Sequence, residues 1–392
     1  MNIKPIDSLM KYPGGKSNEI KYIKNLIPKT YDRYIEPFFG GGSLYLYLKP
    51  KKSIINDITI ELTMFYSLLK EGEERIQFKK ELECYVKYWN NLDIFIKEFN
   101  DLLTILYKKY NNNEFNDYNI SIEIKNIFLN KINIFNELFE ENFCINKQDM
   151  FNKIQNIVVS KFKRLNHTNT KDINYISFKI ETAFKSGFYM HFRDIMNKSK
   201  RGEIKISNVK NIANYYFIRE YCYSSMFRYN EFGDFNIPYG GYNQKTLDKR
   251  LITLFSNDVK ELFNKTIIEN MDFESVLNKH NPTENDFIFF DPPYDSNFST
   301  YSNNKFTEQD QERLSRLIYN LKSKFIMIIK ETPLILNLYD NENFKNKGIK
   351  IESFEKIYLF NIEGRNKRNV KHLIIHNIKN KPTKSKSLFD FQ

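Results

Sequence analysis

The sequence contains little cysteine and histidine, and what it contains is scattered. Its three cysteines, Cys84, Cys144 and Cys222, are too widely spaced for a disulfide framework or a zinc motif. The five histidines form no ligand cluster. His372 and His376 are four positions apart, but they lie in a strand-like run, where this spacing does not converge on one metal as it would on a helix. We therefore expect a protein that binds no metal.

Long hydrophobic runs and targeting signals are also missing from the sequence. No segment approaches the roughly 20 apolar residues that a membrane-spanning helix needs, and the N-terminal MNIKPIDSLMKYPGGK lacks the apolar core of a signal peptide. Acidic residues are outnumbered, because 60 Lys and Arg face 48 Asp and Glu and leave a net charge of +12. These features predict a cytoplasmic protein, and the positive charge favours a nucleic acid as its partner.

Two common phosphate-binding motifs are incomplete. Gly15-Lys16-Ser17 resembles the end of a phosphate-binding loop, but Met10 stands where that motif requires its first glycine. The glycines at 40–42 do not have the G-x-G-x-x-G spacing, so a nicotinamide cofactor is not favoured.

The pattern of apolar residues divides the chain into an interrupted α/β domain. Residues 1–72 alternate between strand and helix patterns, residues 73–250 are mostly helical in periodicity, and the α/β pattern resumes over 251–378. Within the helical part, residues 227–243 have the alternation and turn residues of a β-hairpin. We expect a mixed sheet closed by an antiparallel pair, an inserted and mostly helical domain, and a disordered basic tail at 379–392.

Ligands of open α/β sheets bind at the carboxyl ends of the strands, and the first two expected strands end in suggestive residues. The segment EPFFGGGS places Gly40, Gly41 and Gly42 where the backbone can approach a ligand closely. Asp57 ends the next strand and could accept hydrogen bonds from the hydroxyls of a ribose. A glycine turn followed by a helix N-cap is the alternative interpretation.

The segment FIFFDPPY ends a buried strand with an unusual group of residues. Proline lacks an N–H and fixes φ, so Pro292-Pro293 gives a rigid exit from the strand and leaves the Pro292 carbonyl available to a ligand. Asp291 supplies a second acceptor, and Tyr294 supplies an aromatic face. Two acceptors beside a ring fit a planar base with an exocyclic amino group. The alternative is an ordinary strand end followed by a turn.

These motifs, taken in order, resemble a known family. KYPGGK, EPFFGGGS, NDI, MDF, FRYNEFGDFNIPYG and DPPY follow one another as in the Dam-like (group alpha) DNA adenine-N6 methyltransferases. The resemblance implies a Rossmann-like methyltransferase fold, S-adenosyl-L-methionine as the cofactor, double-stranded DNA as the substrate and site-specific transfer of a methyl group to adenine N6. It also implies that the target adenine is turned out of the stacked DNA helix and that the inserted domain recognises the target sequence.

The resemblance assigns three sets of residues. The catalytic set is Asp291, Pro292, Pro293 and Tyr294. The cofactor set is Tyr12, Lys16, Glu36, Phe39, Gly40, Gly42, Asp57, Asp272, Phe273 and Asp291. The DNA-binding set is Tyr223, Ser224, Met226, Arg228, Pro238 and Tyr301, with Arg228 placed to read a guanine.

Several alternatives stay open at the level of the sequence. The same chemistry would serve cytosine N4 or an RNA adenine, and a DNA-binding protein could keep the fold without catalysis. Basic runs at 161–164 and 197–205 could contact phosphate or form a solvated face, and Arg193 could have a structural or a phosphate-binding role.

The partners are less defined than the chemistry. A cognate restriction endonuclease acting separately is one expectation, and an orphan or phage methylase is the alternative. A monomer suits an enzyme that modifies one base at a time. The C-terminal SLFDF loosely resembles peptides that dock on sliding clamps, although Ser385 replaces the usual glutamine.

Overall fold

The computed structural model describes residues 5–166, 172–225, 227–241, 247–294, 306–358 and 368–379. The chain forms two compact units. The α/β unit comprises Met1–Ser8, Gly14–Lys70 and Asn257–Gln392, and the helical unit comprises Leu9–Pro13 and Glu71–Ser256. The sequence pattern predicts that residues 1–72 form one segment of the α/β domain. Leu9–Pro13 instead belongs to the helical unit, because its backbone is bonded there: the Tyr216 hydroxyl donates to the Leu9 carbonyl (2.8 Å) and the Lys11 N–H donates to Glu220 (2.8 Å).

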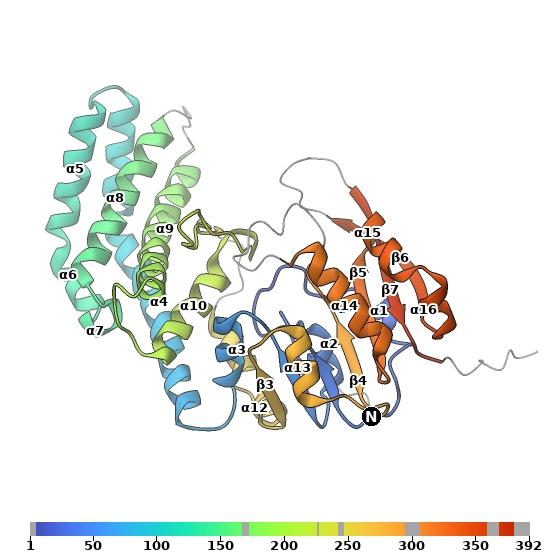
Figure 1. Ribbon diagram of the computed structural model, residues 1–392. Helices are drawn as coiled ribbons and strands as arrows, with labels where there is room; N and C mark the ends of the chain where they lie inside the picture. The colour runs from blue at the N-terminus through green and yellow to red at the C-terminus, as the bar shows by residue number, and fades with distance from the viewer. Residues whose placement is uncertain are drawn as a thin grey trace, which may run out of the picture. The chain divides into compact units, whose positions relative to one another are not determined.

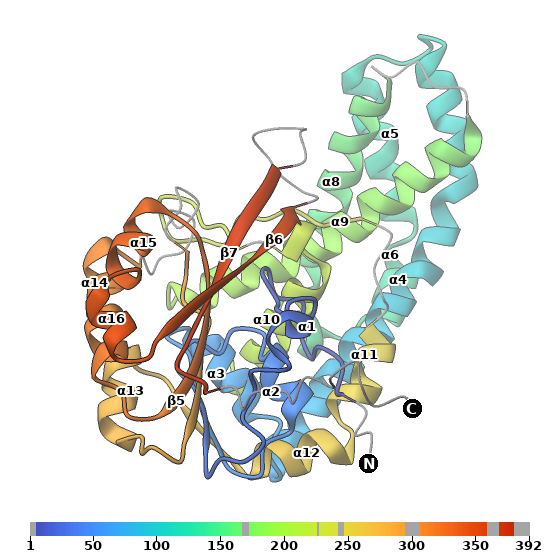
Figure 2. The same ribbon diagram turned by 90° about the vertical axis from the view of Figure 1, so that its right-hand side faces the viewer.

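The α/β unit contains a seven-stranded sheet in the order β3-β2-β1-β4-β5-β7-β6. Its first five strands are parallel: β1 (Tyr34–Glu36), β2 (Ser53–Asn56), β3 (Thr266–Glu269), β4 (Phe287–Phe290) and β5 (Lys324–Lys330). β6 (Lys350–Tyr358) and β7 (Arg368–His376) close the sheet antiparallel, as Figure 2 shows. The predicted mixed α/β fold with an antiparallel closing pair is confirmed.

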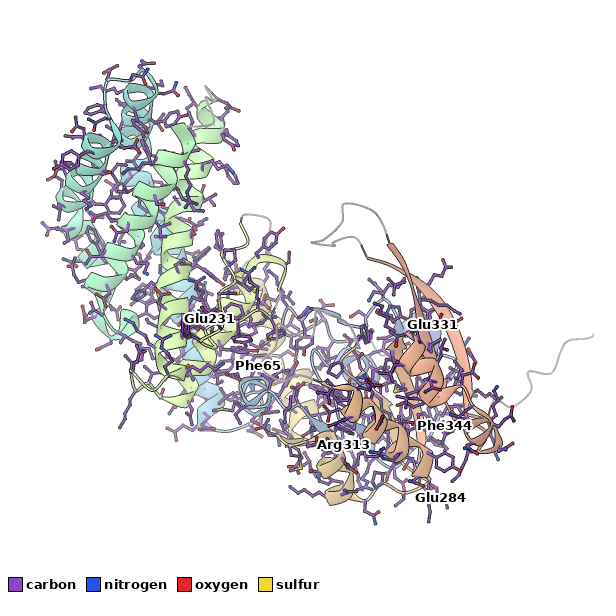
Figure 3. The ribbon with its side chains drawn as sticks, turned by 45° about the horizontal axis from the view of Figure 1, so that its top comes forward. Phe65, Glu231, Glu284, Arg313, Glu331 and Phe344 are labelled. Atoms are coloured by element: carbon purple, nitrogen blue, oxygen red, sulfur yellow. The ribbon has the colours of Figure 1, made fainter. Side chains whose placement is uncertain are left out.

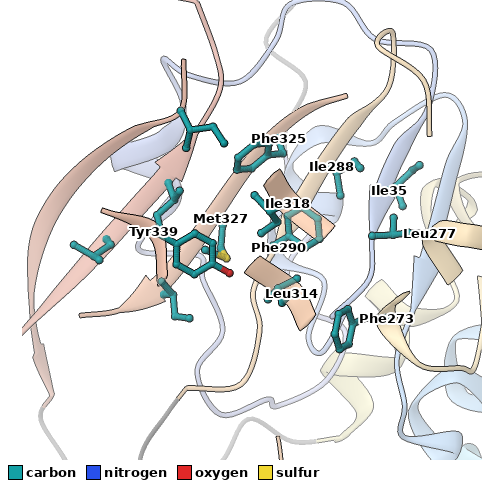
Figure 4. Packing of buried hydrophobic residues seen from close by; sticks show 14 of the residues in the cluster. Ile35, Phe273, Leu277, Ile288, Phe290, Leu314, Ile318, Phe325, Met327 and Tyr339 are labelled. Atoms are coloured by element: carbon teal, nitrogen blue, oxygen red, sulfur yellow. The ribbon is translucent and has the colours of Figure 1, made fainter. Parts of the chain in front are cut away.

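Helices cover both faces of this sheet, because its central strands are apolar on both sides. The other elements of the unit are α1 (Ile20–Ile23), α2 (Ser43–Leu48), α3 (Ile60–Ser67), α12 (Asn257–Asn264), α13 (Phe273–His280), α14 (Glu308–Asn320), α15 (Pro333–Tyr339) and α16 (Glu342–Asn346). On one face Ile288, Phe290 and Met327 pack against Leu314 and Ile318 of α14 (Figure 4). On the other face the rings of Tyr34, Tyr45 and Phe263 are in contact.

The helical unit is a bundle of long helices (Figure 1). Its elements are α4 (Glu73–Asn111), α5 (Asp117–Asn130), α6 (Ile132–Leu138), α7 (Glu141–Cys144), α8 (Lys147–Asn166), α9 (Ile173–Lys200), α10 (Asn208–Tyr221), the 3-10 turn η1 (Tyr223–Ser225) and α11 (Leu247–Leu254). Its core is rich in phenylalanine, and the rings of Phe95, Phe99, Phe128 and Phe184 meet between α4, α5 and α9. The predicted helical character of this stretch is confirmed.

The predicted hairpin within this unit is looser than expected. Between residues 222 and 241 the chain folds back through two isolated antiparallel bridges, Cys222↔Tyr239 and Tyr229↔Phe235, rather than through two regular strands. Helix α9 supplies the missing support. Asn197 bonds the backbone of Phe235 in both directions (3.0 and 2.9 Å), and Arg193 donates to the carbonyl of Ile237 (3.3 Å). In this structure Arg193 therefore has a structural role.

Gly187 marks the closest approach of α8 and α9. A Cβ at this position would lie 2.6 Å from the Cα of Ile154, which is backbone and cannot move aside. We expect Gly187→Ala to lower the free energy of unfolding by about 2–3 kcal/mol, although alanine favours helix formation. The only tryptophan, Trp89, is buried in α4, so its fluorescence during denaturation follows this unit. Asn152→Ala on the exposed face of α8 is the control, and an equal loss there would contradict the close-packing argument.

Candidate active site

The predicted catalytic residues lie where the strand order reverses. β1 and β4 are adjacent and parallel, the connections on either side lead in opposite directions, and Asp291 follows the last residue of β4. This is the position at which open α/β sheets bind ligands.

An ion pair occupies this position. The Lys16 ammonium lies 2.7 Å from the Asp291 carboxylate, donates to the Gly14 carbonyl (3.0 Å) and sits 5.1 Å from the centre of the Tyr294 ring. Lys16 is only 5% exposed. Burial alone would lower the pKa of Lys16, but the Asp291 charge and the Tyr294 hydroxyl outweigh it, so the lysine remains a cation. Burial also disfavours the charged form of Asp291 and therefore raises its pKa, whereas the positive charge of Lys16 opposes that rise.

The segment after Asp291 is held by residues that the motifs did not identify. Gln311 of α14 donates to the Pro293 carbonyl (3.1 Å) and fixes the second proline. His372 of β7 packs against the Tyr294 ring (5.5 Å between centres). Burial lowers the pKa of His372 to about 4, so a neutral imidazole supports the tyrosine. Neither residue had a sequence signal, because each contacts the motif only after the sheet has formed.

The glycine loop is joined to the end of the neighbouring strand. Gly40 has a positive φ of 49°, and its N–H donates to one oxygen of Asp57 (2.9 Å). The Thr59 N–H donates to the other oxygen (2.9 Å). Burial raises the pKa of Asp57, although both backbone donors oppose the shift. Each carboxylate oxygen has a second lone pair with which it can accept from a ligand hydroxyl.

The two phenylalanines of EPFFGGGS have different environments. Phe39 is 3% exposed, and its ring packs edge-on against Tyr45 and Tyr66 in the core. Gly42 has a φ of 62°, and a Cβ there would lie 2.4 Å from the Phe39 ring, so this glycine accommodates the packing of Phe39. The neighbouring Phe38 is half-buried and packs against Phe273 (5.3 Å). Phe38, which the motif alone did not single out, is thus the ring nearer the predicted adenine site.

The predicted pair Asp272–Phe273 begins α13. Asp272 caps this helix by accepting from the Glu274 N–H (2.9 Å), and it also accepts from Arg313 (2.7 Å). The Arg313 guanidinium lies over the Phe273 ring (4.8 Å) and projects from α14, as Figure 3 shows. Arg313 therefore orients both residues.

Two further polar residues lie at the strand ends. Glu36 ends β1 and accepts from the Tyr34 hydroxyl (2.6 Å). Burial raises the pKa of Glu36 well above its usual range despite this hydrogen bond, and the charge of Asp291 adds to the rise. Asn56, which sequence reasoning missed, ends β2 and links three strand ends: its amide donates to the carbonyls of Pro37 (3.0 Å) and Met271 (2.9 Å).

Four predicted DNA-binding residues lie on the folded-back loop of the helical unit. Tyr223 is 51% exposed, and its N–H donates to the Pro238 carbonyl (2.9 Å). Ser224 is exposed with a φ of 52°. The Arg228 guanidinium is bonded to the side chain (2.8 Å) and the carbonyl (3.2 Å) of Asn236. Met226 and Tyr301 lie outside the described residues.

The basic residues near this loop have structural partners. Lys200 donates to the Gly233 carbonyl (3.3 Å), and Arg201 pairs with Asp234 and Glu203. They hold the turn that contains Glu231 (Figure 3). The predicted cofactor residue Tyr12 also belongs to the helical unit, where its ring packs against Phe227 (5.4 Å).

The described ranges contain no cluster of three or more His, Cys, Asp or Glu that could hold a metal ion. None of the helices described has the length and apolar character that crossing a membrane requires.

Comparison with known proteins identifies the family. The model of the D12 class N6 adenine-specific DNA methyltransferases matches residues 12–185 and 145–352. The Type II methyltransferase M1.LlaDCHI of Lactococcus lactis subsp. cremoris is 24% identical over 91% of this chain and 94% of its own length. M.MjaIII of Methanocaldococcus jannaschii is 24% identical over 96% of this chain and all of its own length. M.CviBI of Paramecium bursaria Chlorella virus NC1A is 33% identical over 42% of this chain and 60% of its own.

The family match covers most of the chain and includes the residues of the ion pair and of DPPY. It confirms the predicted activity class and implies S-adenosylmethionine as the cofactor and DNA as the substrate. The chain therefore belongs to the D12 class of N6 adenine-specific DNA methyltransferases.

Proposed function

We propose that Asp291 is the catalytic acceptor in methyl transfer to adenine N6, and that Lys16 keeps it charged. The single observation that carries this assignment is the 2.7 Å ion pair between the buried Lys16 and the half-buried Asp291 at the end of β4, next to the Tyr294 ring. The Asp291 carboxylate and the Pro292 carbonyl would each accept one hydrogen of the amino group while the base stacks on Tyr294. Gln311 engages the carbonyl of Pro293, which leaves that of Pro292 for the base.

Holding both amino hydrogens weakens the conjugation of the nitrogen lone pair with the ring and makes the amine a better nucleophile. When bound, S-adenosylmethionine would supply an electrophilic methyl group to this amine, and its sulfur would keep the electrons of the broken S–C bond as a thioether. Asp291 or solvent then takes the proton that the amine loses. Because the base has to reach Asp291 at the end of β4, we propose that it is turned out of double-stranded DNA.

The polar groups of the α/β unit fit the cofactor. Carboxyls at three strand ends, Glu36, Asp57 and Asp291, suit a ligand that carries a sulfonium, an ammonium and a ribose. We propose that Asp57 binds the ribose hydroxyls, that Glu36 and the backbone of Phe39, Gly40 and Gly42 border the methionine end, and that Asp272, Phe273 and Phe38 border the adenine. Tyr12 and Lys16 remain proposed cofactor contacts from the KYPGGK motif.

We propose that the loop of the helical unit reads the target sequence, with Tyr223, Ser224, Met226 and Pro238 around Arg228. Asn236 fixes the Arg228 guanidinium, which can therefore meet a guanine without reordering. Tyr301 remains a proposed DNA contact.

Arg228→Ala is expected to weaken discrimination at one base pair of the recognition site by about 1–3 kcal/mol. The measurement is kcat/KM on cognate DNA and on DNA changed at single positions. Arg316→Ala, an exposed arginine on α14 that pairs with Glu312 (3.6 Å), is the control. A uniform loss on all sequences would instead assign Arg228 to the phosphate backbone.

The relatives point to the biological setting. Two of them that align over nearly their whole length are named Type II methyltransferases. We propose that this enzyme works as a monomer in the cytoplasm and protects DNA in a restriction-modification system, with an endonuclease that acts separately. The tail at 379–392, almost all of it outside the described residues, retains only the clamp-peptide resemblance as a hypothesis.

The test is to express the protein in cells that lack adenine methylation and to map modified bases by single-molecule sequencing. We expect modified adenines at one short motif. Their absence in cells that contain the folded protein would contradict the proposed sequence-specific role.

A further inference from the structure

The segment that follows Lys16 is attached to β6 by two contacts that the motifs do not include. Glu19 forms an ion pair with Lys356 of β6. The Tyr22 ring stacks on Phe354 of the same strand, with 4.3 Å between centres and 17° between planes. In Figure 2, α1 lies beside β6 accordingly. Glu19 and Lys356 are 337 positions apart in the sequence, so only the folded sheet brings them together.

This attachment leads directly to Lys16. The N–H groups of Glu19 and Ile20 donate to the Lys16 carbonyl at 2.9 and 3.1 Å. The backbone of Lys16 is thus fixed by the same short turn whose Glu19 side chain is fastened to β6. A displacement of Glu19 would move the lysine that pairs with Asp291.

Glu19 is itself an unusual group. It is 2% exposed, and among the described residues its Oε2 has no hydrogen-bond partner. A buried carboxylate is costly unless a cation neutralises it, and Lys356 meets Oε1. Without Lys356, Glu19 would lose this cation, and its charge, which disfavours the ionised form of Asp291, would be uncompensated.

We infer that Glu19 and Lys356 are positioning residues for methyl transfer: Lys356 holds and neutralises Glu19, so that Lys16 stays paired with Asp291. This inference rests on the proposed role of Asp291 and adds two residues outside the motifs.

The charges around Asp291 predict the direction in which each substitution shifts the pH dependence of activity. Lys16 and Lys356 favour the ionised carboxylate, whereas Glu19 disfavours it. Glu36 is a further acid near Asp291, Tyr294 lies beside Lys16, and His372 is neutral at physiological pH. Asp291 is a charged acceptor only when ionised, and protonation leaves it a much weaker acceptor, so activity falls as the pH drops through its pKa. Removing Lys356 raises that pKa and moves the acid limb to higher pH, and removing the Glu19 charge moves it to lower pH.

The experiment measures kcat/KM for DNA methylation against pH, which reports groups of the free enzyme. Lys356→Met is expected to reduce kcat/KM about tenfold at neutral pH and to shift the acid limb upward by about 0.5–1 unit. Glu19→Gln, which keeps shape and a hydrogen-bond acceptor, is expected to shift the limb downward with little loss at high pH. The double variant is expected to recover to within about threefold of the unmodified enzyme.

Lys371→Met is the matched control, since Lys371 lies on the adjacent β7 in an exposed pair with Glu331 (2.8 Å). Figure 3 labels that glutamate. Limb shifts of the same sign for Glu19→Gln and Lys356→Met, no shift in either, or a double variant as impaired as Lys356→Met would overturn the inference. Glu19→Gln also keeps the test valid if Lys356→Met fails to fold. Methylation by the unmodified enzyme, measured alongside, separates these outcomes from a failure of the proposed function.

Discussion

Asp291→Asn is expected to reduce methyl transfer to DNA by about 10³-fold or more, while the protein remains folded. Asparagine has the same shape, but its amide cannot act as the charged acceptor for the amino group. It also leaves the buried Lys16 without its 2.7 Å partner. The loss should appear in single-turnover kcat rather than in KM for DNA, because the missing interaction develops with the transition state.

Asp258→Asn is the control for this prediction. Asp258 forms an exposed ion pair with Lys49 (3.1 Å), with 70% of the Asp258 side chain accessible, and such pairs contribute little. Full activity of Asp291→Asn would remove that residue from the mechanism.

Lys16→Met is expected to lower kcat/KM at neutral pH by about 10²-fold. Methionine fills similar space but removes the cation that opposes the raised pKa of Asp291. Asp291 would then be protonated to a higher pH, so the remaining activity should rise as the pH increases, where the native enzyme has already levelled off. The measurement is the pH profile of kcat/KM.

Lys24→Met is the matched control, because Lys24 is exposed at the end of α1. A uniform loss at every pH would mean that Lys16 acts on cofactor binding alone. In that case the KM for S-adenosylmethionine would carry the effect.

Short sequence patterns predicted the parts of the fold that depend on neighbouring residues. The run FIFF became β4, the stretch with helical periodicity became the bundle that begins with α4, and the closing strands pair antiparallel. Each of these segments has a clear periodicity of apolar residues or a continuous apolar run. Helices α15 and α16 have seven and five residues, too few for a helical period to emerge.

The surroundings of the site could not be predicted in the same way. A motif with two adjacent phenylalanines does not reveal which ring enters the core, and here packing against Tyr45 and Tyr66 buries Phe39. Gln311 reaches Pro293 and Lys356 reaches Glu19 from distant segments, so the roles of both residues depend on how the strands are ordered. Arg228 came from the family resemblance, but its bond to Asn236 depends on how the loop folds back.

The most direct test of this account is the identity of the methylated base. The purified enzyme would be incubated with methyl-labelled S-adenosylmethionine and unmethylated double-stranded DNA or RNA, and the products digested to nucleosides. We predict label in N6-methyldeoxyadenosine from DNA, and none with Asp291→Asn. Label in N4-methyldeoxycytidine, label only in RNA, or cofactor binding without any transfer would contradict it.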